Sequence, residues 1–154
     1  MFWRTNYLEG AVDISRGELR DLLLESLPPL SDQFKPEHIL QLLSDDSYHL
    51  MTREMVESFA FHKHDHISWM PYKKDSGDCD DFASLWYADM VKAWNKLAYR
   101  LPVALGLVVY KRFSGKMHKD GWLAWQGGIS IYFAQEGKTY NPEEEISSLN
   151  YLYA

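Results

Sequence analysis

The spacing of apolar residues changes between the two halves of the chain, and this change constrains the fold more than any other feature. In the first half, apolar residues recur at intervals of three or four, the period of an amphipathic helix. The second half instead contains short apolar segments typical of strands, at 103–113, 121–126, 128–135 and 138–140. Helices followed by hairpin-linked strands predict an α+β fold with an antiparallel sheet.

Local signals predict where several of these elements begin and turn. Ser15 and Glu18 have the spacing of a capping box, which predicts that a helix starts directly after Ser15. Its expected buried stripe consists of Leu19, Leu22, Leu23 and Leu27. Further short helices are expected from Pro36 and after Thr52, a residue that can act as an N-cap. Gly127-Gly128 is typical of a tight hairpin turn.

Length and composition limit the classes of protein to consider. A chain of 154 residues with 46% apolar residues fits a single globular domain. The net charge of −6 leaves no basic excess for phosphates, so we expect no nucleic-acid partner. No apolar run is long enough to span a bilayer, so we expect no membrane partner. A single cysteine and no secretory pattern predict a cytoplasmic location, and no cofactor motif is found.

The most informative predicted element is a helix of about 20 residues that starts at Cys79. Asp78 is a good N-cap, and Asp81 lies at N3, where a negative charge suits the helix dipole. The free N–H groups at such a start stabilise a thiolate or an oxyanion. The carboxylates of Asp78, Asp80 and Asp81 act in the opposite direction on the thiol pKa. A reactive thiol and a buried, inert cysteine therefore both stay open.

The segment Gly77-Asp78-Cys79-Asp80-Asp81-Phe82-Ala83 resembles the nucleophile element of bacterial transglutaminase-like cysteine proteinases. It is most similar to that of small phage-associated proteins in the superfamily, and a looser similarity covers residues 45–145. The resemblance implies a papain-like or transglutaminase-like fold, with N-terminal helices and the Cys79-bearing helix packed on an antiparallel sheet. It also implies one domain over 1–154, in which a helical N-terminal extension (1–44) precedes a transglutaminase-like core (45–145).

The resemblance also implies a catalytic set, from which this sequence departs. In the superfamily a His on one strand activates the thiol and a polar residue on the next orients the His. Here Leu123 stands where that His is expected, and Asn141 stands where a Glu is expected. Cys79, His118 and Asn141 would form the set only if the strand began before Gly121. The simpler interpretations are a solvated loop for His118 and a turn for Asn141.

Two functions are compatible with these residues. Leu123 favours a catalytically degenerate transglutaminase-like protein, which binds a host or phage protein in the host cytoplasm as an inhibitor or accessory factor. The resemblance implies a phage or prophage origin. The alternative is an active thiol hydrolase or acyltransferase, in which Cys79 attacks an amide or thioester. Whether the protein is an enzyme, and its oligomeric state, are left open.

A histidine cluster offers a metal-binding alternative. His62, His64 and His66 alternate along the chain, so a strand would present all three imidazoles on one face, and such a set suits Zn, Ni or Cu. Solvated loop histidines are the simpler interpretation, and we assign no metal site.

Overall fold

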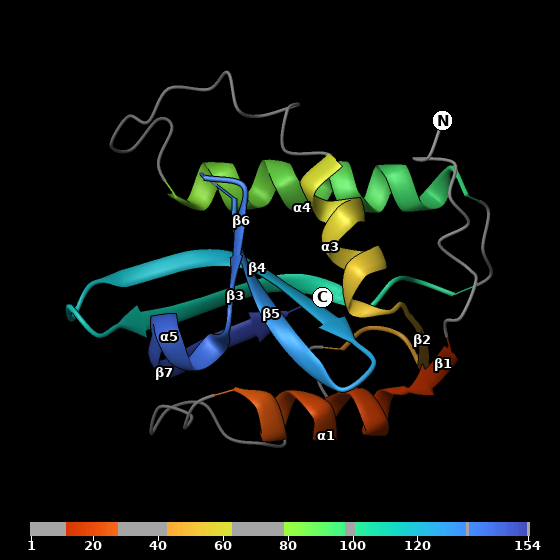
Figure 1. The fold of residues 1–154 in the computed structure, drawn as a ribbon, viewed down its shortest axis with the longest axis horizontal. Helices are drawn as coiled ribbons and strands as arrows, with labels where there is room; N and C mark the ends of the chain where they lie inside the picture. The colour runs from red at the N-terminus through yellow and green to blue at the C-terminus, as the bar shows by residue number, and fades with distance from the viewer. Residues whose placement is uncertain (1–11, 28–42, 63–78, 98–100, 135, 154) are drawn as a thin grey trace.

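A five-stranded antiparallel sheet forms the centre of the molecule (Figure 1). The computed structural model describes residues 12–27, 43–62, 79–97, 101–134 and 136–153. The strand order is β6-β5-β4-β3-β7, so each neighbouring pair from β3 to β6 is a hairpin and the last strand returns beside β3. The strands are β3 Leu105–Arg112, β4 Met117–Trp125, β5 Gly128–Phe133, β6 Lys138–Tyr140 and β7 Ile146–Tyr153.

A two-stranded ribbon adjoins one end of this sheet. It pairs β1 (Val12–Ser15) with β2 (Ser47–Leu50) in antiparallel register. Single bridges join His49 to Val103 and Met51 to Trp125, so the segment around β2 contacts the start of β3 and the end of β4. The ribbon therefore brings the first described residues of the chain against the central strands.

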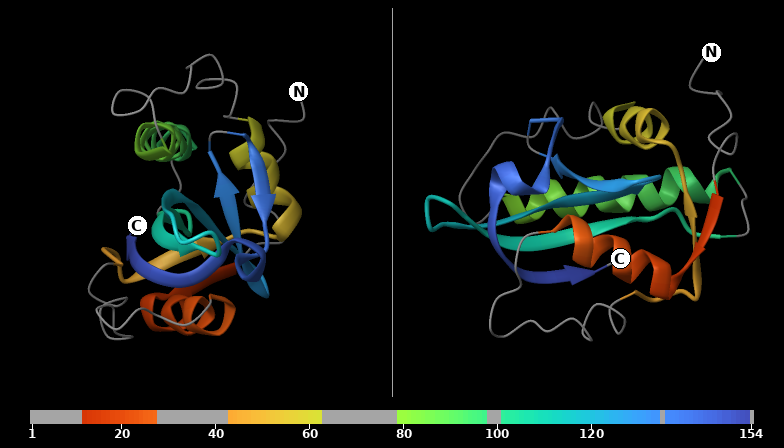
Figure 2. Two further views of the ribbon diagram at one scale, coloured as in Figure 1. Left: turned by 90° about the vertical axis from the view of Figure 1, so that its left-hand side faces the viewer. Right: turned by 60° about the horizontal axis from the view of Figure 1, so that its bottom comes forward.

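Short helices lie on both sides of the sheet, and each side has its own core (Figure 2). On one side α1 (Arg16–Ser26) packs with Leu19, Leu23 and Leu27 against the sheet. On the other side lie α3 (Arg53–His62) and α4 (Cys79–Asn95). Helix α5 (Pro142–Glu145) has one turn and links β6 to β7.

The predicted start of the first helix is confirmed. The Ser15 hydroxyl accepts from the backbone N–H of Glu18, and the Glu18 carboxylate accepts from the backbone N–H of Ser15, both at 3.1 Å. These reciprocal bonds satisfy two of the donors that a helix N-terminus leaves unpaired. Thr52 likewise caps α3 through a 3.3 Å bond from the N–H of Met55. The helix expected from Pro36 lies outside the described residues.

Helix α4 begins at Cys79, as predicted, and docks closely on β4. A Cβ atom at Gly121 would overlap the six-membered ring of Trp86, so only glycine permits this approach. Trp86 also stacks on Tyr132 of β5, with ring centroids 4.9 Å apart. Helix and sheet are therefore fixed against each other by a buried aromatic pair.

The predicted fold class is wrong in its architecture. A papain-like or transglutaminase-like arrangement was expected, with the N-terminal helices and the Cys79-bearing helix packed on a sheet. The molecule is instead organised by the five-stranded sheet, which short helices cover from both sides, and by a separate ribbon. The strands β1 and β7 were not predicted. Register shifts in the pairing of β7 break the period of two, so its buried residues Ile146, Leu149 and Leu152 fall three apart.

Candidate functional site

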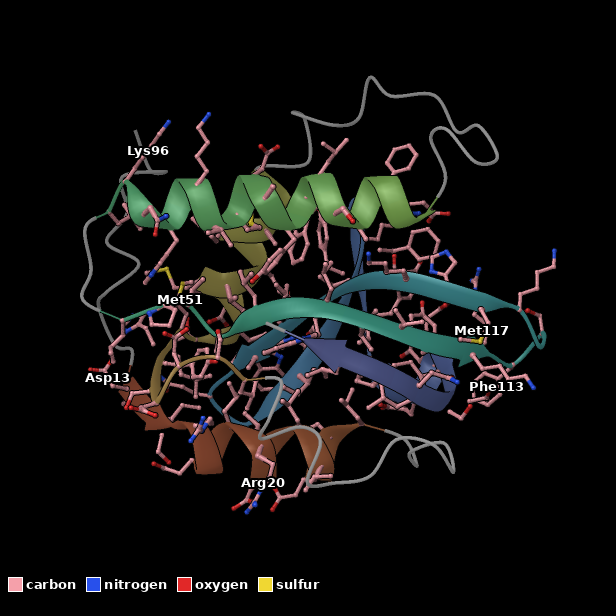
Figure 3. All side chains as sticks on the ribbon, turned by 180° about the vertical axis from the view of Figure 1, so that it is seen from behind. Asp13, Arg20, Met51, Lys96, Phe113 and Met117 are labelled. Carbon is pink, nitrogen blue, oxygen red and sulfur yellow. The ribbon has the colours of Figure 1, made fainter. Side chains whose placement is uncertain are left out.

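A groove runs along the C-terminal half of α4, where this helix faces the start of β3 and the segment before β2. Figure 3 labels Lys96, which lies just after the end of α4 and lines the outer part of the groove. It consists of two adjoining hollows, of about 160 Å³ and about 680 Å³. Both are lined by Tyr87, Val91 and Asn95, and we call the pair the Tyr87 groove. The larger hollow is shallow and wide open to solvent, and the smaller one is more enclosed.

The helical repeat positions the α4 side of this groove. Tyr87, Val91 and Asn95 are four residues apart, so they follow one another along one side of the helix. Trp94 anchors this part of α4, because its Nε1 donates to the carbonyl of Leu101 at 2.8 Å. Its ring stacks on His49 of β2 at 5.4 Å. The α4 wall is therefore fixed to the rest of the molecule.

The opposite wall carries polar groups on a constrained segment. The Tyr48 hydroxyl accepts from the backbone N–H of Asp45 at 3.1 Å, and the Ser44 hydroxyl donates to the Asp45 carboxylate at 3.2 Å. Burial raises the pKa of the Tyr48 hydroxyl above its ordinary value. Ser44, Asp45 and Tyr48 all line the smaller hollow.

A second polar cluster lies within the central sheet, around Asp120 of β4. Its carboxylate accepts from the Tyr110 hydroxyl at 2.6 Å and contacts Nδ1 of His118 at 2.8 Å. The Asp120 side chain is only 2% exposed and that of His118 only 11%. Burial raises the pKa of Asp120 and that of Tyr110 above their ordinary values. In the tautomer whose Nδ1 donates to Asp120, the Nε2 atom of His118 is an acceptor.

The solvated-loop interpretation of His118 is wrong, because β4 begins at Met117, four residues before the predicted start. The ring of His118 lies 4.8 Å from that of Phe133 on β5. His118 and Asp120 lie on the same side of β4, because they are two residues apart on one strand. Lys119 and Gly121, which alternate with them, contact α4. The Nζ of Lys119 donates to the Ser84 hydroxyl at 3.2 Å, and Gly121 adjoins Trp86.

The other predicted site residues lie elsewhere. Cys79 is the first residue of α4, while its side chain and those of Asp80 and Asp81 lie outside the described part of the structure, as does Asp78. Asn141 occupies the N-cap position of α5, where its Nδ2 donates to the Glu144 carboxylate at 3.0 Å. The structure thus joins His118 to Asp120 and Tyr110, two partners that the sequence analysis missed. The alternation His118-Lys119-Asp120 opposite Tyr110 was the available signal.

Two predictions remain, one about Leu123 and one about the histidine cluster. Leu123, which stands where a His was expected, is fully buried in the core beneath α3 and α4. His62 ends α3, and its side chain lies outside the described residues together with His64 and His66. Within the ranges that the structure describes, no three His, Cys, Asp or Glu side chains form a metal-binding group.

The fold is similar to that of several solved structures, one of which is a lectin. No protein-family model and no curated protein sequence matches the chain. The solved structure described as the PSL1a-E64 complex matches with a TM-score of 0.70 and 21% identity, over 92% of this chain and 50% of that one. A Polyporus squamosus lectin bound to Neu5Acα2-6Galβ1-4GlcNAc matches with a TM-score of 0.65 and 20% identity, over 92% and 49%.

The chain spans about half the length of these solved chains, and at this identity the likeness shows the fold alone. It overturns the resemblance to transglutaminase-like cysteine proteinases, which is wrong. The inferred degenerate transglutaminase-like function, its thiol-hydrolase alternative and the phage origin are wrong with it. The physical reason is that Gly77–Ala83 is short and rich in Asp, and acidic residues are favoured at the start of any helix.

The expected protein partner is not confirmed by these similar structures, and the lectin among them was solved with a glycan. None of the helices in the described ranges is both long and apolar enough to cross a bilayer.

Proposed function

We propose that this protein binds carbohydrate, and that the sugar lies in the Tyr87 groove. The observation that carries the proposal is the groove's composition: an aromatic and aliphatic floor bordered by hydroxyl, carboxylate and amide groups. A pyranose ring has the complementary pattern, with C–H groups on its faces and hydroxyls around its rim.

The floor of the groove suits a sugar face. Tyr87 is half-buried, so part of its ring is open to a ligand while the rest packs in the protein. Val91, Val103 and Leu105 extend the apolar surface beside it. A rigid aromatic ring gives a large contact area at a low cost in conformational entropy.

The rim suits sugar hydroxyls. The Asp45 carboxylate accepts hydrogen bonds, and the Asn95 amide both donates and accepts. Asp45 is held in place by Ser44 and Tyr48, so little order has to be imposed when a ligand binds. Because hydroxyls of a sugar act as donors and acceptors, this mixed rim matches them better than an all-acidic rim would.

The lysines at the outer hollow favour an acidic sugar. Lys92 and Lys96 are exposed and line the larger hollow next to Tyr87. A sugar that carries a carboxylate, such as sialic acid, would place its charge beside them. The Polyporus squamosus lectin to which the fold is similar was solved with a sialylated trisaccharide, which supports this choice of probe.

Calorimetric titration of the full chain with Neu5Acα2-6Galβ1-4GlcNAc and with Galβ1-4GlcNAc tests the proposal. We expect Tyr87→Ala to weaken binding of both sugars at least tenfold, which corresponds to about 1.4 kcal/mol. Leu85→Ala, an exposed substitution on the same helix outside the groove, is the matched control and should leave affinity unchanged. Absence of binding to either sugar, or equal affinity of the Tyr87→Ala variant, would contradict carbohydrate binding in this groove.

The preference for acidic sugars has a separate readout. The double substitution Lys92→Gln and Lys96→Gln should weaken only the sialylated probe, and the loss should shrink as salt is added. If both probes weaken equally, the lysines act on the groove as a whole rather than on the sugar carboxylate, and the acidic-sugar preference is refuted.

A further inference from the structure

The smaller hollow of the Tyr87 groove has the size of a single ligand substituent. Its volume is about 160 Å³, whereas sites that enclose a whole small molecule start at about 300 Å³. It is also the more enclosed of the two hollows. A sugar in the groove would therefore keep its rings over the larger hollow and extend one substituent into the smaller one.

The most deeply buried side chains that line the smaller hollow are largely apolar. Trp94, Val103 and Leu105 line it with at most 6% of their surface exposed. A polar group pressed against such side chains loses its hydrogen bonds to water and gains none in return. A substituent made only of hydroxyl groups is therefore disfavoured here, and one that ends in a methyl group is favoured.

The charges of the groove are separated between its two hollows. Of the described residues that line the smaller hollow, Asp45 alone is charged near neutral pH. The cations Lys92 and Lys96 line the larger hollow instead. Because like charges repel, an acidic sugar would turn its carboxylate toward the lysines and away from Asp45. The substituent that enters the smaller hollow is consequently a neutral one.

Two polar groups at the smaller hollow complement an amide. The Ser44 hydroxyl donates to Oδ2 of Asp45 at 3.2 Å, and Oδ1 of the same carboxylate can accept from a ligand N–H. The side-chain amide of Asn95 lines the same hollow and can donate to a ligand carbonyl. A neutral group with an N–H, a carbonyl and a methyl meets all of these requirements, and the acetamido group of a sugar has this composition.

We propose that the smaller hollow binds the acetamido group of an N-acetylated sugar. This specificity rests on the proposed binding of carbohydrate in the Tyr87 groove, and it names the class of sugar that the groove selects. The acetamido methyl lies against Trp94 and Leu105, its N–H donates to Asp45, and its carbonyl accepts from Asn95.

Calorimetric titration of the full chain with Galβ1-4GlcNAc and Galβ1-4Glc tests this specificity, because the two disaccharides differ only in an acetamido group and a hydroxyl. We expect Galβ1-4GlcNAc to bind about tenfold more tightly, the effect of one hydrogen bond to a charged group. Asp45→Ala should abolish most of this preference by weakening the binding of Galβ1-4GlcNAc. Asp46→Ala is the matched control, because this neighbouring carboxylate is outside the set that lines the hollow, and it should keep the preference intact.

The possible results distinguish this specificity from carbohydrate binding itself. Equal affinities for the two disaccharides, both weakened in Tyr87→Ala, would overturn the acetamido specificity while carbohydrate binding in the groove still stands. A preference that survives in Asp45→Ala would overturn the placement of the acetamido group beside Asp45. Absence of binding by either disaccharide would contradict the proposed function and overturn the specificity with it.

Discussion

At the scale of single residues, Asp120 determines the local order of β4. It is a buried carboxylate with two partners, the Tyr110 hydroxyl and the His118 ring. A buried charge is costly unless it is hydrogen-bonded, and its partners become costly in turn when it is removed. The polar segment from Met117 to Asp120 is consequently a strand rather than the loop that its composition suggests.

Two substitutions of Asp120 should distinguish the effect of its charge on stability from the effect of its hydrogen bonds. Asp120→Ala leaves Tyr110 and His118 without their acceptor, and we expect a loss of about 1–3 kcal/mol in the free energy of unfolding. Asp120→Asn keeps an acceptor oxygen and removes the charge whose burial raises the pKa of Asp120, so it should cost less. Urea denaturation at neutral pH measures both. A costlier Asn variant would contradict this role.

Tyr110 should make the protein sensitive to alkaline pH. Burial and the neighbouring Asp120 raise the pKa of Tyr110 above its ordinary value. A raised folded-state pKa contributes stability that is fully present below the unfolded value of about 10 and is lost as pH rises further. In Tyr110→Phe the decrease in the free energy of unfolding between about pH 9 and pH 11 should be smaller than in the wild type. Equal decreases would count against the burial of this hydroxyl.

At the scale of elements, the sequence predicted those whose signals are local. The capping box at Ser15, the start of α4 at Cys79 and the turn at Gly127 each depend on a few adjacent residues. Strand β7 has no such signal, because its bulges disrupt the alternation of buried residues. The early start of β4 depends on Tyr110, a partner on another strand. The groove residues were missed because Tyr87 and Asp45 come together only through packing.

The contact between α4 and β4 is the element-level feature easiest to test. Gly121→Ala places a Cβ into the Trp86 ring, and we expect it to lower the free energy of unfolding by about 1–3 kcal/mol. Gly17→Ala is the matched control, because a Cβ there would meet only the Ser15 hydroxyl at 3.9 Å. That control lies in the first turn of α1 and should be neutral or slightly stabilising. Thermal unfolding of both variants measures these changes in stability. A Gly121→Ala protein of unchanged stability would contradict the close docking of α4 on β4.

At the scale of the whole molecule, one sheet separates two hydrophobic cores. The ribbon of β1 and β2 contacts the helix that forms one wall of the Tyr87 groove. The Asp13 carboxylate of β1 lies 3.0 Å from Nδ1 of His49 on β2, and His49 stacks on Trp94 of α4. The N-terminal ribbon thereby supports the wall that carries Tyr87 and Asn95. The likeness to the two solved structures concerns this whole architecture, since it covers 92% of the chain.

An NMR titration of the isotopically labelled protein with Neu5Acα2-6Galβ1-4GlcNAc shows whether a sugar lies in the Tyr87 groove. If it does, the side-chain amide of Asn95, the indole N–H of Trp94 and the backbone amide of Asp45 should shift together along one saturable curve. Shifts that instead cluster on the β3–β4 hairpin, or a spectrum unchanged at saturating sugar, would contradict it.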